Sequence, residues 1–374
     1  MTIAVHICFT DNATDPATSL HYQSFLFLAA QHPEHHFIFI FDKPYPPGLI
    51  IHKNITALLL PPQVKNPLLQ HYWYNFKIPL LLNKYNADHF VSNGAVCSLR
   101  TNIPQTMILS DLSFMDKKNL YAAGEKRYLK KYFKKFIAKT SVIAVTNQRV
   151  RNTLAGIYPD AIDKIQVIGY AVNVETKQLD QEEIQVIKEK YSSGKEYFLA
   201  FITDATIENA VMILKAFSAF KKRQLSNMQL VLMISSTQKE ELVPDFKNYK
   251  YKDEVKLISP ENIKQERELI AAAYAAIYLP AINILENKGL LVLTNEVPLV
   301  TSDNDFCKSF YHEAALYSPA DDKQLAERMM LLYKDENLRN NLLHAGRSIA
   351  AAYTWHHMAG KLGQSLLDTA VQTA

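Results

Sequence analysis

Glycine is scarce in this sequence. It occurs 10 times among 374 residues, whereas an average usage of about 7% would give roughly 26. Hydrophobic residues make up 48% and charged residues 21%, so collagen-like, fibrous and disordered chains are excluded and a globular protein is expected. At about 100–200 residues per domain, the length predicts two domains.

Long apolar runs and paired cysteines are also lacking. Purely apolar runs, such as residues 25–30, are shorter than the about 18 residues that suggest a membrane-spanning helix. Residues 1–10 contain no lysine or arginine, so they do not resemble a secretory signal. The three cysteines are widely spaced, which fits a reducing compartment and indicates no zinc site. We therefore expect a cytoplasmic protein.

Short runs rich in Val, Ile and Phe alternate with helical stretches, which is typical of parallel strands joined by crossover helices. Residues 3–168 contain seven such runs, and a second series of five follows between residues 197 and 301. The polar segment 173–195 separates the two series, and the pattern is helical from Asp321 onward. The fold class is α/β, with two doubly wound domains whose ligands are expected in a cleft at the carboxyl ends of the strands.

Several segments resemble the bacterial family-4 glycosyltransferases. On the acceptor side these are residues 72–82 (YWYNFKIPLLL), 98–101 (SLRT) and 108–112 (ILSDL). On the donor side they are 215–217 (KAF), 273–278 (AYAAIY), 297–302 (VPLVTS) and 353–355 (YTW). The resemblance implies a GT-B fold, with an acceptor-side Rossmann-like domain at 1–174, a donor-side Rossmann-like domain at 175–353 and a helix at 354–374 that crosses back to the first domain.

The same resemblance implies a nucleotide-sugar donor, a saccharide or lipid-linked acceptor, and no metal or other cofactor. The donor motifs of the family are nevertheless largely replaced in this chain. The glycine and the Arg-Lys pair that follow the first donor-domain strand correspond to Ile202, Ile207 and Glu208, and only Asn209 matches. A glutamate repels a diphosphate that an arginine would bind.

The two carboxylates of the family's E-x7-E motif correspond to Asn283 and Leu291, and leucine accepts no hydrogen bond from a ribose hydroxyl. Further family glycines correspond to Ile284, Glu286 and Glu296. The missing glycines therefore lie where relatives bring their backbone close to a nucleotide-sugar or form the adjoining turns.

The resemblance also suggests residues for the remaining site. Asp111 is the catalytic candidate near the acceptor, with a helix or turn cap as the alternative. Arg100 is an acceptor-side candidate for a phosphate or carboxylate, with a structural ion pair as the alternative. On the donor side, Asn287 and Lys288 lie at the start of a helix and could form a substitute anion site, and Asn209 and Asn283 are further candidates.

Residues 126–139 predict a basic amphipathic helix, with apolar residues on one face and seven cations on the others. Such a helix could contact anionic lipid at the inner face of the membrane, or its aromatic residues could pack on the chain's own sheet. Nucleic acid is not expected, because no further basic stripe accompanies the helix. The adjacent histidine pairs at 35–36 and 356–357 lack the spacing of metal ligands, and we expect no metal.

Two functions remain open from the sequence. The first is a retaining glycosyltransferase that moves a hexose from a nucleotide-sugar, with activity that is weak or lost. The second is a non-catalytic relative that binds saccharide or activates another glycosyltransferase.

Overall fold

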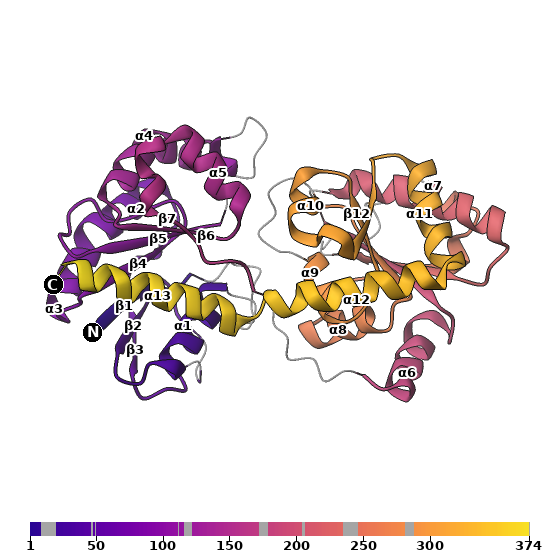
Figure 1. Cartoon of the computed structure of the whole chain (residues 1–374), viewed down its shortest axis with the longest axis horizontal. Coiled ribbons are helices and arrows are strands. Elements are labelled where there is room, and N and C mark those ends of the chain that lie inside the picture. Colours follow the sequence, from indigo (N-terminus) through magenta and orange to yellow (C-terminus); the bar gives the residue numbers. More distant parts are fainter. Residues whose placement is uncertain are drawn as a thin grey trace. The chain divides into compact units, whose positions relative to one another are not determined.

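The computed structural model describes residues 1–8, 20–45, 48, 50–110, 112–115, 122–171, 179–203, 206–234, 246–280 and 288–373. The chain forms two compact units (Figure 1): Met1–Asn173 with Tyr353–Ala374, and Val174–Ala352. Within the described residues, each unit is built on one parallel sheet. The α/β class with two Rossmann-like domains is therefore confirmed.

The sheet of the first unit has the strand order β3-β2-β1-β4-β5-β6-β7, and every neighbouring pair is parallel. Its strands are apolar because helices cover both faces, so that β2 (HFIFIF) is buried from its second residue to its last. The bounds are β1 Thr2–His6, β2 His36–Phe41, β3 Ile55–Leu59, β4 His89–Asn93, β5 Gln105–Leu109, β6 Val142–Val145 and β7 Ile165–Val167.

Two hydrophobic clusters sandwich this first sheet. One contains residues of the helices α3, α4 and α5, and the other contains residues of α1 and of the C-terminal helix α13, which pack on each other. The helices of this unit are α1 Leu20–Gln31, α2 Pro67–Tyr72, α3 Ile78–Lys84, α4 Ala123–Lys139, α5 Gln148–Ile157 and α13 Trp355–Thr373, with a π-helix, η2, at Trp73–Lys77.

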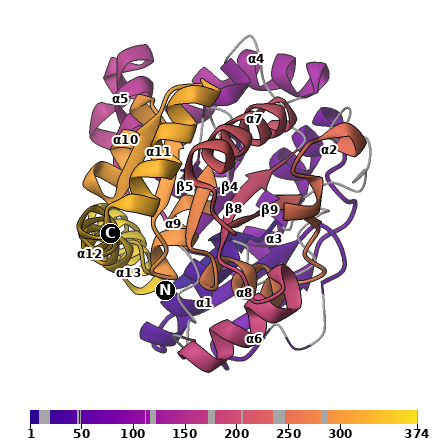
Figure 2. The ribbon, with the colours of Figure 1, turned by 90° about the vertical axis from the view of Figure 1, so that its right-hand side faces the viewer.

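The sheet of the second unit has the order β10-β9-β8-β11-β12-β13, again parallel throughout. Helices α7 and α11 lie side by side and cover one face (Figure 2). The strands are β8 Tyr197–Ile202, β9 Gln229–Ile234, β10 Val255–Ile258, β11 Ala275–Tyr278, β12 Leu299–Ser302 and β13 Ala315–Ser318. The helices are α6 Gln181–Ser192, α7 Ile207–Gln224, α8 Ile263–Ala271, α9 Lys288–Thr294, α10 Asp305–Tyr311, α11 Asp322–Lys334 and α12 Glu336–Ala352.

The strand orders locate the points where ligands bind in such sheets. In the first sheet the chain builds outward from β1 in one direction and then from β4 in the other, and in the second sheet the same reversal lies between β8 and β11. Ligands of doubly wound folds bind at the carboxyl ends of the strands beside such a reversal. The ends of β1 and β4, and of β8 and β11, are therefore where functional side chains are expected.

Some backbone positions of the kind that glycine usually occupies are held here by other residues. Five residues other than glycine adopt a positive φ within the described chain: Asn86, Ser193, Leu225, Glu296 and His312. This left-handed region is one that glycine occupies without strain. Glu296, where the family resemblance indicates a missing glycine, has a φ of 55°. The chain therefore keeps turns of this kind without their usual residue.

Candidate functional site

A buried polar cluster lies at the strand reversal of the first sheet. His6 is the last residue of β1, and Asp42 directly follows β2. The π-helix η2 supplies Trp73 and Tyr74. π-helical turns are rare and are frequent at functional sites. The cluster is thus assembled at the carboxyl edge of the sheet from three separate segments.

His6 is the centre of this cluster. Its Nδ1 lies 2.8 Å from the hydroxyl of Tyr74, and its ring centroid is 4.5 Å from that of Trp73. Asp42 accepts a hydrogen bond of 2.9 Å from the backbone amide of Val64. His6 is 5% exposed, and its Nε2 is buried without a hydrogen-bond partner in the described part of the chain. The imidazole therefore has unused hydrogen-bonding capacity at the place where a ligand is expected.

Burial determines the protonation states of this cluster. Desolvation lowers the pKa of His6 to about 4, although the charge of Asp42 acts in the opposite direction. Desolvation also raises the pKa of Tyr74 well above its usual value, with Cys8 and Asp42 adding to the effect. His6 and Tyr74 are consequently both neutral at neutral pH. A neutral imidazole can accept a hydrogen bond from a hydroxyl group or donate one to it.

Sequence reasoning did not find His6. The available signal was weak: a lone histidine at the end of the apolar strand TIAVH. Its partner Tyr74 is 68 positions away and lies inside segment 72–82, which carries part of the family resemblance. Only the tertiary structure brings the two residues together.

At the strand reversal of the second sheet, Thr203 and Thr206 form hydrogen bonds with each other between β8 and α7. The hydroxyl of Thr206 accepts a hydrogen bond of 2.9 Å from the amide of Thr203, and the amide of Thr206 donates to the carbonyl of Thr203. Backbone amides in such a turn bind phosphate in nucleotide-binding folds. These two amides already have partners, and Glu208 is exposed in the first turn of α7.

Asn209 and Lys288, two donor-side candidates from the sequence, both have protein partners. The side-chain amide of Asn209 donates a hydrogen bond of 3.0 Å to the carbonyl of Leu279, which follows β11, and so ties α7 to the strand reversal. Lys288, the first residue of α9, forms an ion pair of 2.6 Å with Glu266 of α8. An anion at this place would compete with Glu266 for the lysine.

The other predicted residues lie in different places. Asp111, Asn283 and Asn287 lie outside the described residues. Arg100 is exposed, and its guanidinium carbon lies 4.0 Å from the ring centroid of Phe76. Within the part of the chain that the structure describes, its observed partner is thus an aromatic ring.

Two further positions from the motif comparison are described. Ile202 is buried at the end of β8, and Leu291 is half-buried on α9. Ile284 and Glu286 lie outside the described residues. Gly289, next to Lys288, leaves room for the buried Tyr311, because a Cβ at this position would overlap the tyrosine ring.

The basic segment forms helix α4, and its aromatic face packs inward. Tyr128, Phe133 and Phe136 are buried against the first sheet, whereas Lys130, Lys131, Lys134 and Lys135 are exposed. The aromatic residues are therefore part of the core and the lysines face solvent. Among the described residues, no helix is long and apolar enough to cross a membrane.

A cavity of about 480 Å³ lies at the opposite, amino edge of the second sheet. Its lining includes Glu196, Tyr274 and Val297, which precede β8, β11 and β12. It is therefore not the cavity in which a ligand at the strand reversal would be bound.

Comparison with known proteins gives the fold and a partial family match. Residues 182–349, which lie within the second unit, match the sequence model of the family "Glycosyl transferases group 1". No curated protein matches the chain.

Three solved structures illustrate the structural similarity. A glycosyltransferase from Rickettsia africae has a TM-score of 0.73 and 15% identity, with 100% of this chain and 99% of the other covered. Sucrose-phosphate synthase from Thermosynechococcus elongatus has a TM-score of 0.72 and 14% identity, with both chains covered completely. The Anabaena protein HepE, in complex with UDP and glucose, has a TM-score of 0.69 and 10% identity, with coverage of 98% and 99%. The chain has the GT-B fold, and its second unit is similar to group 1 glycosyl transferases.

Proposed function

We propose that this chain is a bacterial family-4 glycosyltransferase that moves a hexosyl group, with retention, from a nucleotide-sugar to a saccharide or lipid-linked acceptor. The observation that carries the proposal is the match of residues 182–349 to group 1 glycosyl transferases. The matched segment contains the strand reversal between β8 and β11, where a nucleotide is expected in a doubly wound sheet. The UDP and glucose bound to the Anabaena protein are consistent with this donor class.

On the acceptor side, we assign the first role to Asp111 and a second to His6. A carboxylate at Asp111 would accept a hydrogen bond from the reacting hydroxyl. The neutral imidazole of His6, held through Nδ1 by Tyr74, would hydrogen-bond another acceptor hydroxyl through Nε2. Neither role requires a metal or another cofactor.

On the donor side, the described residues support weak binding of the diphosphate. Glu208 places a negative charge in the first turn of α7, and Lys288 is paired with Glu266. Two cations at the diphosphate would stabilise both the bound donor and the leaving group. We therefore expect slow turnover, because little of that stabilisation is available here.

The same donor-side charges favour a second candidate. A non-catalytic protein that binds saccharide at the first unit, or activates another glycosyltransferase, would have no need for a diphosphate site. The exposed position of Glu208 is the specific observation in its favour. In either role, the exposed lysines of α4 would allow the chain to lie against anionic lipid.

A transfer assay separates the two candidates. The purified chain is incubated with a panel of UDP- and GDP-hexoses and saccharide acceptors, and product is detected by mass spectrometry and its anomeric configuration by NMR. The proposal predicts that the wild type transfers the hexosyl group slowly and with retained configuration, and that Asp111→Asn shows no transfer. Saccharide binding without any turnover would instead support the non-catalytic candidate.

A further inference from the structure

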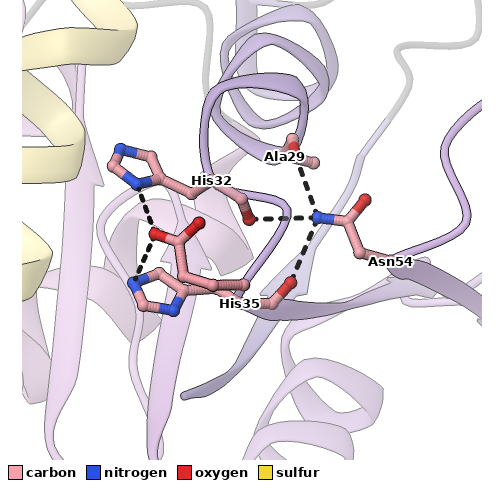
Figure 3. A network of polar contacts seen from close by, with 5 residues as sticks. Ala29, His32, His35 and Asn54 are labelled. Carbon is pink, nitrogen blue, oxygen red and sulfur yellow. Dashed lines mark hydrogen bonds and ion pairs between the residues drawn. The ribbon is translucent and has the colours of Figure 1, made fainter.

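The turn between α1 and β2 brings two histidines and a glutamate together. Nδ1 of His32 and Nε2 of His35 lie 3.0 and 3.7 Å from the same carboxylate oxygen of Glu34. The two imidazole rings are parallel within 9°, with centroids 5.5 Å apart (Figure 3). Three potential metal ligands of the kinds that zinc prefers thus converge on one side of a four-residue turn.

Two of the three separations between these ligand atoms are close to those around a tetrahedral ion. One ligand atom from each residue lies within 4.8 Å of the others. Zinc–ligand distances of about 2.0–2.1 Å give a separation of about 3.3 Å between neighbouring ligands of a tetrahedron, and the two nitrogen–oxygen distances lie on either side of that value. We propose that His32, Glu34 and His35 form a zinc-binding site, with a water molecule as the fourth ligand.

The turn that carries these ligands is held from outside by Asn54. The side-chain amide of Asn54 donates to the backbone carbonyls of Ala29, His32 and His35, at 2.9, 3.2 and 3.1 Å. Figure 3 shows this amide on the opposite side of the turn from the two rings. Because the backbone is fixed in this way, little ordering would be needed when an ion binds.

The remaining ring nitrogens leave Nδ1 of His32 and Nε2 of His35 for the ion. Nε2 of His32 faces α13, because a Cβ at Gly363 would lie 3.8 Å from it. Nδ1 of His35 is buried. The Glu34 side chain is 58% exposed, so an ion can reach the site from solvent.

The location indicates a structural role for the ion. His36 begins β2, so the turn lies at the amino edge of the first sheet, whereas the His6 cluster lies at the carboxyl edge. An ion bound here would join the end of α1 to the start of β2. Binding to the folded chain alone would stabilise the first unit.

The experiment is a titration of the full metal-free chain with Zn²⁺ in competition with a chromophoric chelator. We expect one saturable equivalent for the wild type and at least about tenfold weaker binding for each of His32→Gln, Glu34→Gln and His35→Gln. The matched control is His36→Gln, because His36 belongs to the same segment but bonds to Thr56. Its affinity should equal that of the wild type.

Thermal unfolding with tryptophan fluorescence is the second readout, because both tryptophans, Trp73 and Trp355, belong to the first unit. Zn²⁺ should raise the Tm of the wild type and of His36→Gln but not of the three ligand variants. The proposal is overturned if no saturable equivalent is found, if the ligand variants bind as tightly as the wild type, or if His36→Gln loses as much affinity as they do.

Discussion

Acidification should destabilise the first unit through two buried histidines, His6 and His89. Nε2 of His89 lies 2.9 Å from the hydroxyl of Thr106, and burial lowers its pKa to about 4, as it does that of His6. An unfolded histidine has a pKa of about 6.5. Between these two pH values the unfolded chain binds more protons than the folded chain, so the free energy of unfolding falls as the pH falls.

The magnitude follows from the two pKa values. One pKa unit corresponds to about 1.36 kcal/mol. Lowering the pKa of a histidine from 6.5 to about 4 therefore means that the free energy of unfolding falls by about 3 kcal/mol in total as the pH drops below both pKa values. About 2 kcal/mol of that is lost when the pH reaches about 5. For His6 and His89 together, the loss at about pH 5 is about 4 kcal/mol.

Urea unfolding followed by tryptophan fluorescence measures this effect in the first unit. The free energy of unfolding is compared at about pH 7.5 and about pH 5 for the wild type, for His89→Gln and for the exposed control His357→Gln. The pH-dependent loss should be about 2 kcal/mol smaller in His89→Gln than in the other two. An equal loss in all three proteins would refute the assignment of a buried, neutral His89.

Three further substitutions test particular contacts. Leu225→Gly should stabilise the second unit by about 0.5–1 kcal/mol in thermal melts, because Leu225 has a φ of 49° and its side chain is 89% exposed. Leu225→Ala should not stabilise it, and equal effects of the two substitutions would contradict this reasoning. Asn54→Asp should cost the first unit about 2–3 kcal/mol in urea unfolding, because an acceptor replaces the donor to three carbonyls; unchanged stability would show that those hydrogen bonds contribute little. Gly289→Ala should cost about 1–3 kcal/mol by forcing Tyr311 to move, whereas the control Gly156→Ala, which meets open space, should cost nothing.

Much of the fold could be predicted from the sequence because its strands are apolar runs separated by helical stretches. The strand β13 was missed: its sequence ALYS is only four residues long, and it directly follows a short 3-10 turn at His312–Ala314. Length alone does not explain this, because the three-residue strand β7 (IQV) is predicted; β13 contains no Val, Ile or Phe, the residues that mark the other strands.

The candidate sites were less predictable because they depend on contacts between distant segments. A lone histidine at position 6 gives no sign of Tyr74, which approaches it only when β1 and η2 pack together. The sequence pairs His35 with its neighbour His36, whereas the structure groups His35 with His32 and Glu34 through the bend of the turn. In both cases the sequence gives the residue types, but it does not show that these residues lie close together in the folded chain.

The central claim is that the second unit has a nucleotide-sugar site in which cations have been replaced. Calorimetric titration with UDP and GDP tests it on the wild type, on the double variant Ile207→Arg/Glu208→Lys, and on the control Glu182→Lys, which changes an exposed glutamate in the first turn of α6. We predict that the double variant binds at least about tenfold more tightly than the other two. Micromolar binding by the wild type, or no gain in the double variant, would contradict the claim.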